Sequence, residues 1–191
     1  MKLSVIMSAH NNENAVSEAI ESVLFQTFKN FEFIIVDDGS GDNTSQIIKK
    51  YQQKDKRIIL ISQENLGLTK SLNIALKQAK GEYIARQDAD DISYPERFNR
   101  QISLLEGNSD IGFLGCGFET IDEAGSIRER IIIKNLSTKI AKELKKSNVF
   151  CHGSMMFRRR LLENVSGYRE FFKYSQDYDL YLRLLQYSMP G

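Results

Sequence analysis

The chain has 191 residues, enough for one domain with a sizeable core, and its 41% of hydrophobic residues argue against global disorder. Because 26 Lys and Arg residues balance 25 Asp and Glu residues, the net charge of +1 gives no electrostatic case for a nucleic-acid partner. No run approaches the ~20 apolar residues of a membrane span, and the two cysteines, Cys116 and Cys151, lack zinc-site spacing, so we expect a soluble protein of the reducing cytoplasm.

Strand-like and helix-like segments alternate through the first half of the chain. Four apolar runs predict buried strands, at residues 3–7, 31–36, 58–61 and 82–85. Three stripes of apolar residues at helical spacing predict helices between these strands, at residues 16–24, 47–51 and 68–79. Asn43 is placed to cap the second helix and Gly81 to end the third. Such alternation with short connections indicates βαβ units and a parallel sheet.

The pattern is less regular in the second half. We expect a helix over residues 97–106 and two further strand regions, "IGFLGCGF" and "SIRERIIIK". Polar helices at about residues 137–146 and 177–187 close the chain. The sequence shows no internal repeat and no low-complexity segment, so its length favours a single domain.

Three polar clusters follow the predicted strands: "SAHNNE" after the first, "DDGSGD" after the second and "RQDADD" after the fourth. In an open α/β sheet, ligands bind outside the carboxyl ends of the strands, and a parallel sheet gathers those ends along one edge. We therefore expect the three clusters to meet at one site, although they lie far apart in the sequence.

The "RQDADD" cluster is a candidate metal site. If the chain is still extended there, Asp88 and Asp90 point the same way. A divalent cation that keeps several waters usually takes one or two carboxylates plus substrate phosphates. A solvated turn before Pro95 would also explain these residues, because Asp-x-Asp is short and common. The place of the cluster at a strand end favours the metal.

The "DDGSGD" cluster is a candidate ligand loop. Asp37 and Asp38 cannot both face one ligand in an extended chain, so we expect one to stabilise the loop and the other to meet ligand. Gly39 and Gly41 permit backbone angles that a Cβ would forbid. The segment is not a dinucleotide-binding fingerprint, because no G-x-G-x-x-G follows a strand, and the chain has no P-loop.

The remaining candidates each have a structural and a functional explanation. His10 and His152 are the only histidines and lie in polar clusters, although a lone histidine is more often a surface or core residue. The arginines at 158–160 could be a solvated run or could neutralise phosphate. Asp177 and Asp179 fall in the first turn of a predicted helix, where carboxylates favour the dipole, but Asp177 could also be a general base. Spacing alone does not choose between these explanations.

Several segments, in order, resemble family 2 glycosyltransferases of the GT-A fold. They are "VIMSAHNNENAVSEAIESVLFQTFKNFEFIIVDDGSGDNT", "NLGLTKSLNIALKQAKGEYIARQDADD" and "CHGSMMFRRRLLENVSGYREFFKYSQDYDLYLRL". The resemblance implies an α/β fold with a mainly parallel, Rossmann-like sheet flanked by helices. It implies one domain over residues 1–191, with a nucleotide-sugar-binding half at 1–94 and a less regular acceptor-side half at 95–191. Family members generally continue further, so we expect the C-terminus to be truncated.

The resemblance also implies roles for individual residues in binding the donor. The family's first nucleotide-binding loop corresponds to Ser8, Ala9, His10, Asn11 and Glu13, with His10 where an aromatic ring commonly sits on the base. Asp38 matches the aspartate that bonds the uracil edge. Asp88, Ala89 and Asp90 match the D-x-D motif, with Asp88 towards the ribose and Asp90 as the ligand of Mg²⁺ or Mn²⁺.

The second half of the chain is expected to supply the acceptor side. Asp177 matches the proposed catalytic base, although Gln176 replaces the glutamate that usually precedes it. Leu72 stands where many members have an arginine near the diphosphate, and Lys70 is expected to substitute for it. We assign three more residues to the acceptor side, namely Asp91, His152 and Arg158.

These matches imply an inverting, metal-dependent glycosyltransferase that moves a sugar from a nucleotide donor, expected to be UDP-linked, to a hydroxyl of a glycan, lipid-linked or protein-linked acceptor. Gln176 and the abrupt C-terminus leave open a non-catalytic module that holds nucleotide-sugar or a partner. A nucleotidyltransferase fits less well, because "SAHNNENA" has neither glycine nor lysine to hold a triphosphate. Peripheral contact with the inner face of the cell membrane and homo-oligomerisation also stay open.

Overall fold

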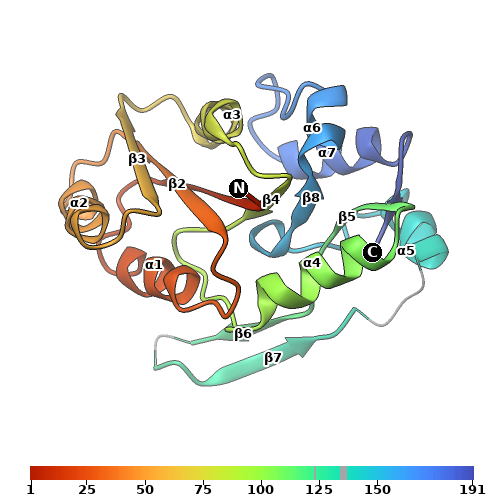
Figure 1. Ribbon diagram of the computed structural model, residues 1–191, viewed down its shortest axis with the longest axis horizontal. Helices are drawn as coiled ribbons and strands as arrows, with labels where there is room; N and C mark the ends of the chain where they lie inside the picture. The colour runs from red at the N-terminus through yellow and green to blue at the C-terminus, as the bar shows by residue number, and fades with distance from the viewer. Residues whose placement is uncertain (123, 134–136) are drawn as a thin grey trace.

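A seven-stranded sheet runs through the computed structural model, which describes residues 1–122, 124–133 and 137–191 (Figure 1). Its strands are β1 (Leu3–Ala9), β2 (Phe31–Asp38), β3 (Ile58–Gln63), β4 (Tyr83–Arg86), β5 (Ile111–Leu114), β8 (Met156–Arg158) and β9 (Met189–Pro190), in the order β3-β2-β1-β4-β8-β5-β9. Strands β3, β2, β1 and β4 are parallel, whereas β8 runs antiparallel to β4 and β5. The predicted parallel sheet is confirmed.

Helices cover both faces of this sheet. They are α1 (Val16–Leu24), α2 (Thr44–Lys54), α3 (Leu68–Gln78), α4 (Arg97–Gly107), α5 (Ser137–Leu144), α6 (Arg159–Asn164) and α7 (Gln176–Leu184), with a short 3₁₀ turn, η1 (His152–Ser154). In the described ranges no helix is both long and apolar enough to cross a membrane.

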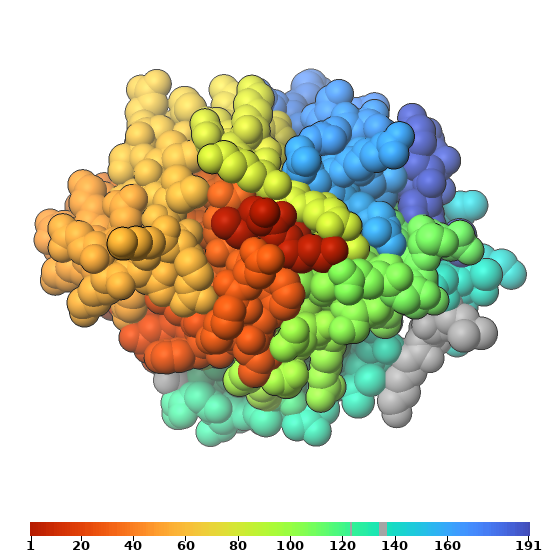
Figure 2. All heavy atoms as spheres, in the orientation of Figure 1, coloured from red at the N-terminus to blue at the C-terminus, as the bar shows by residue number. Residues whose placement is uncertain are grey.

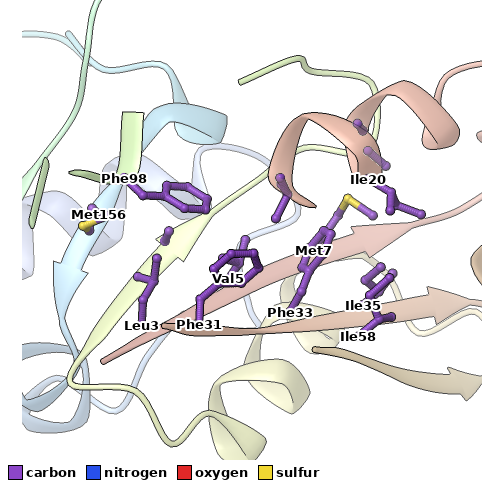
Figure 3. Packing of buried hydrophobic residues seen from close by; sticks show 14 of the residues in the cluster. Leu3, Val5, Met7, Ile20, Phe31, Phe33, Ile35, Ile58, Phe98 and Met156 are labelled. Carbon is purple, nitrogen blue, oxygen red and sulfur yellow. The ribbon is translucent and has the colours of Figure 1, made fainter. Parts of the chain in front are cut away.

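The buried strand residues alternate between two cores, because successive side chains of a strand point to opposite faces. Val5 and Met7 pack with α1, α2 and α4 on one face, as Figure 3 shows for this core. Ile6 packs on the other face with α3, α5, α6 and α7. Burial on both faces explains the nearly continuous apolar runs of β1 and β2. In Figure 2 the first residues, in red, reach the surface where β1 begins.

A separate antiparallel hairpin lies outside the main sheet. It consists of β6 (Phe118–Ile121) and β7 (Ile127–Ile131), and in Figure 1 it lies along the lower side of the molecule. The Tyr94 hydroxyl donates a hydrogen bond of 2.6 Å to Glu119 Oε2, which ties the hairpin to the loop before α4. The strands that the sequence predicts in the regions "IGFLGCGF" and "SIRERIIIK" are therefore present.

Two sequence predictions about helix ends need correction. Asn43 occupies the N-cap position of α2, but its side chain makes no capping bond there. Asp42 Oδ1 instead accepts a hydrogen bond of 2.9 Å from the Thr44 amide. Helix α3 ends at Gln78, and Gly81 packs so closely against the backbone of Ser4 that a Cβ would overlap it. Gly81 is thus required by packing between segments and not by the end of the helix.

Candidate functional site

A pocket of about 240 Å³ opens where β1, β2 and β4 end. Its walls come from all three predicted clusters and from the start of α3, through Ser8, His10, Asn12, Asp38, Leu68, Asp88, Ala89 and Asp90. The register explains the convergence, because Ala9 lies beside Asp37, and Ile6 lies beside Arg86. The expectation that the three clusters meet at the carboxyl edge of the sheet is confirmed.

The loops after β1 and β2 are held together by hydrogen bonds between them. Asn11 Oδ1 accepts a bond of 2.8 Å from the Gly41 amide, and the Asn11 amide donates to Ser40 Oγ at 3.1 Å. Glu13 Oε2 accepts from the amide and the side chain of Asn43 at 3.0 and 2.7 Å. Asn11 and Glu13, expected to bind the donor, therefore join the two loops and do not line the pocket.

His10 is exposed at the rim of the pocket, and its neighbours fix its tautomer. Its Nδ1 lies 2.8 Å from the carbonyl oxygen of Asp38, which can only accept a hydrogen bond. Nδ1 therefore carries the proton, and Nε2 accepts from the side-chain amides of Asn11 and Asn65, each at 3.2 Å. These contacts orient the ring at the place expected for the base of a nucleotide.

Asp38 is buried and holds the turn before α3. Its Oδ1 accepts bonds from Gln63 Nε2 at 2.7 Å and the Leu66 amide at 2.8 Å, and its Oδ2 accepts from the Gly67 amide at 2.9 Å. Burial raises the pKa of the Asp38 carboxyl, but these bonds outweigh burial and leave its pKa below the ordinary value. Asp38 thus stabilises the loop as well as lining the pocket.

Two buried arginines lie next to the acidic loop, residues 88–91, that follows β4. Arg86 has no exposed surface and forms an ion pair with Asp88. Arg97 donates to the carbonyl of Arg86 at 2.6 Å and to Gln87 Oε1 at 3.0 Å. Burial, followed by the charges of Asp88 and Asp90, raises the pKa of Asp91. The cations lie below the loop and offset part of the repulsion among its carboxylates.

The donor set suits a divalent cation that is bound mainly through substrate. Asp90 is exposed at the pocket wall, and within the described residues its carboxylate accepts no hydrogen bond and forms no ion pair. Asp88 is already paired with Arg86. No group of three His, Cys, Asp or Glu residues that could hold a metal occurs in the described ranges. One free carboxylate fits Mg²⁺ or Mn²⁺ that also takes waters and phosphate oxygens.

The turn η1 brings His152 beside the acidic loop. Gly153 packs so closely against the carboxylates of Asp88 and Asp91 that a Cβ would overlap them. Burial, followed by the positive charge of Arg86, lowers the pKa of His152 to about 3. Its Nε2 lies 2.8 Å from the Tyr168 hydroxyl. The structure therefore brings His152 and Asp91 together next to the pocket.

Asp177 lies in the first turn of α7, near this group. Its Oδ2 accepts a hydrogen bond of 2.8 Å from Asn148 Nδ2. Burial raises the pKa of Tyr168, and the charges of Asp177 and Asp88 raise it further, so this buried tyrosine lies near both carboxylates. Ser175, at φ 56°, makes the left-handed turn that leads into α7. Asp177 thus lies near the acidic loop, with the buried Tyr168 close to both.

Two predicted site residues lie elsewhere. Arg158 pairs with Tyr83, the first residue of β4, so it lies at the opposite end of the strand from the acidic loop. Its guanidinium donates to the carbonyls of Ile111, Leu105 and Asn108 and ties structural elements together. The acceptor-side prediction for Arg158 is therefore wrong. Lys70 is exposed on α3 and does not line the pocket.

Sequence reasoning missed several residues of the site. Asn12 and Leu68 line the pocket, Arg86 supports Asp88, and Asn148 contacts Asp177. The position of Asn12 inside "SAHNNE" was a usable signal. No sequence signal pointed to Asn148, because it lies outside every polar cluster that follows a predicted strand.

Comparison with known proteins agrees with this geometry. The family described as Glycosyl transferase family 2 matches residues 4–166. The O-antigen biosynthesis glycosyltransferase WbnJ of Escherichia coli is 36% identical over 96% of this chain and 71% of its own length. Curated relatives that match at least nine tenths of the chain are longer, and the chain spans 58% to 71% of their lengths.

Two solved structures are similar over almost the entire chain. S. aureus TarS in complex with UDP-GlcNAc is 25% identical, with a TM-score of 0.80 over 100% of this chain and 56% of that one. The mannosyltransferase PcManGT from Pyrobaculum calidifontis, solved with GDP-Man and Mn²⁺, is 18% identical, with a TM-score of 0.79 over 99% of this chain and 53% of that one. The predicted GT-A fold is confirmed.

Proposed function

Because the chain belongs to glycosyl transferase family 2 and is a glycosyltransferase by that membership, we propose that it transfers a sugar from a UDP-linked donor to an acceptor hydroxyl with inversion at the anomeric carbon. The observation that carries the proposal is the single pocket that collects His10, Asp38, Asp88 and Asp90 from three strand ends. Family membership confirms the resemblance seen in the sequence.

The donor would lie across the carboxyl edge of the sheet. His10 presents an oriented ring for the base, and Asp38 supplies a carboxylate at the same wall. Asp38 already accepts hydrogen bonds from Gln63 and from the amides of Leu66 and Gly67, so a donor group such as a uracil N–H would meet an ionised carboxylate that the loop holds in place. TarS, similar in fold, was solved with UDP-GlcNAc, which supports UDP as the nucleotide tested first.

Asp90 would hold a divalent cation against the diphosphate, with Asp88 turned towards the ribose. A bound Mg²⁺ or Mn²⁺ would stabilise negative charge on the departing diphosphate. The free carboxylate of Asp90 supports this assignment, and the similar fold of PcManGT was solved with Mn²⁺. Arg86 keeps Asp88 paired and thereby leaves Asp90 as the carboxylate that is available to a cation.

Asp177 would act as the general base. It would take the proton from the acceptor hydroxyl as that oxygen attacks the anomeric carbon and the bond to the diphosphate breaks. A single displacement of this kind inverts the configuration. The position of Asp177 in the first turn of α7 and its bond from Asn148 support the role, because both favour an oriented carboxylate.

The acceptor would approach past Asp91 and His152. WbnJ is named for O-antigen biosynthesis, which supports a glycan or lipid-linked glycan as the acceptor class. Gln176, the residue before Asp177, is 9% exposed, so its side chain is almost fully buried. Replacement of the usual glutamate there is the one feature that favours a non-catalytic nucleotide-sugar-binding module.

The test is turnover with stereochemical analysis. UDP-sugars would be incubated with the protein, Mn²⁺ and glycan acceptors, and the anomeric configuration of the product read by proton NMR. We expect an inverted product. A retained configuration contradicts the mechanism, whereas donor binding without release of UDP on any acceptor favours the non-catalytic module.

A further inference from the structure

The loop between α6 and α7 carries the two most exposed large apolar side chains of the described residues. Phe171 is 93% exposed and Tyr174 is 82% exposed. Single exposed apolar residues are normal on protein surfaces, but neighbouring ones mark binding sites more often than chance. Two aromatic rings within four residues of each other, beside a candidate active site, therefore suggest a ligand.

The backbone of this loop is fixed although its rings are exposed. The Asn73 side chain donates to the Tyr168 carbonyl at 2.8 Å and accepts from the Tyr168 amide at 3.0 Å. The Thr69 hydroxyl donates to the Phe172 carbonyl at 3.3 Å, and Arg169 pairs with Asp179 at 3.3 Å. The loop thus presents its rings from a preorganised backbone, which lowers the entropic cost of binding.

The loop joins the two parts of the proposed active site. Thr69, which anchors it, follows Leu68 in the wall of the donor pocket. At its other end the loop enters α7 through Ser175, two residues before Asp177. An acceptor whose hydroxyl reaches both the donor sugar and Asp177 must therefore pass close to this loop.

We propose that Phe171 and Tyr174, which we call the platform, each present a ring that stacks on a sugar of the acceptor glycan, an inference that rests on the proposed function. Aromatic rings offer flat apolar faces that match the C–H face of a pyranose, and the Tyr174 hydroxyl adds a polar group. The Phe172 ring packs edge-to-face against Phe171, with 5.9 Å between the ring centroids and 85° between the ring planes.

A membrane surface fits this loop less well. Between residues 169 and 175 the charges of Arg169, Glu170 and Lys173 leave one net positive charge, and Arg169 is already paired with Asp179. Recognition of anionic lipid typically needs clusters of about four to eight basic residues. The loop therefore fits a neutral glycan better than a bilayer.

The chain has no tryptophan, so Phe171→Trp places a single fluorescent reporter on the platform. The protein would be titrated with chitotetraose, cellotetraose and maltotetraose in the presence of UDP and Mn²⁺. We expect a saturable change in the emission of Trp with at least one oligosaccharide. The matched control is Phe25→Trp, because Phe25 is 71% exposed at the end of α1, on the other face of the sheet, and should not respond.

A second variant, Phe171→Ala with Tyr174→Ala, should weaken oligosaccharide binding by about 3- to 10-fold per ring in calorimetry, while UDP binding stays unchanged. No response of Phe171→Trp to any oligosaccharide, an equal response of Phe25→Trp, or a response only to vesicles of phosphatidylglycerol and phosphatidylethanolamine overturns the platform. If wild type binds UDP but binds none of the oligosaccharides, the platform is wrong and the proposed donor site is unaffected. If the protein responds to an oligosaccharide but does not bind UDP, the proposed donor site is wrong instead.

Discussion

The carboxylate of Asp88 is paired with the guanidinium of Arg86, a side chain that has no contact with solvent. Arg97, also buried, contacts the carbonyl of Arg86 from below. Like charges in the acidic loop repel each other, and burial opposes the ionised form of Asp91. The loop is therefore stabilised in part by the protein's own cations, before any metal ion binds.

Replacing Arg86 by Met should be strongly destabilising. It leaves Asp88 without its cation next to Asp91. Because the Asp88 side chain is 30% exposed, the cost should be below the about 3–5 kcal/mol that is typical when one partner of a fully buried pair is removed. Urea unfolding measures the loss directly. Arg100→Met is the matched control, because Arg100 is exposed on α4 and should change stability by less than about 0.5 kcal/mol. Equal effects of the two substitutions would show that the Arg86 pair contributes little.

Asp177→Asn should abolish most transfer while sparing the donor. A positioned base contributes about 10²–10⁴-fold, so turnover should fall by a factor in that range with UDP affinity unchanged. Asp179→Asn is the control from the same helical turn, since Asp179 pairs with Arg183 at 2.9 Å and Arg169 at 3.3 Å. Asp179→Asn should lower stability and leave the pH profile of transfer intact. If Asp177→Asn kept its transfer activity, Asp177 would not be the general base.

Asn148→Ala tests whether orientation of the base matters. The only described polar partner of the Asp177 side chain is Asn148, at 2.8 Å. Loss of the Asn148 side chain should lower kcat by about 10-fold without changing KM for the donor. This decrease is smaller than the one expected from loss of the Asp177 carboxylate itself. A change in donor KM with normal kcat would place Asn148 in donor binding instead.

His152 predicts a pH dependence of stability. Burial, then the charge of Arg86, lowers its pKa from 6.5 to about 3, so the unfolded chain binds a proton at His152 between these values and the folded chain does not. The contribution of His152 is complete above pH 6.5 and is lost as the pH falls towards 3. His152→Gln should reduce the slope of unfolding free energy against pH in that window by up to about 1.4 kcal/mol per pH unit.

Urea unfolding at several pH values between 4 and 7 measures this slope. The same slope in wild type and His152→Gln would contradict a buried, neutral histidine.

Nearly continuous apolar runs made the parallel half of the fold predictable, because a strand that is buried on both faces is mostly apolar. The strand β8 was not predictable in the same way. It has three residues, too few for any periodicity, and its place between β4 and β5 depends on pairing with strands far away in the sequence. Arg158, at its end, was consequently assigned to the wrong edge of the sheet.

Some residues of the site could likewise be predicted from the sequence, and others could not. Asp38, Asp88 and Asp90 were predictable because polar residues at the ends of parallel strands must meet. Arg86 was not, because a charged residue at a strand end usually reaches solvent, and only the tertiary structure shows it buried beneath Asp88. Two buried arginines, Arg86 and Arg97, offset part of the repulsion among the carboxylates of this loop.

The most direct test of the donor site is calorimetric titration of UDP, with and without Mn²⁺, into wild type and Asp90→Ala. We predict that Mn²⁺ strengthens UDP binding to wild type and that Asp90→Ala loses this enhancement, because Asp90 offers the free carboxylate at the pocket wall. UDP binding that is independent of Mn²⁺, or enhancement that survives in Asp90→Ala, would contradict a donor site built on this carboxylate.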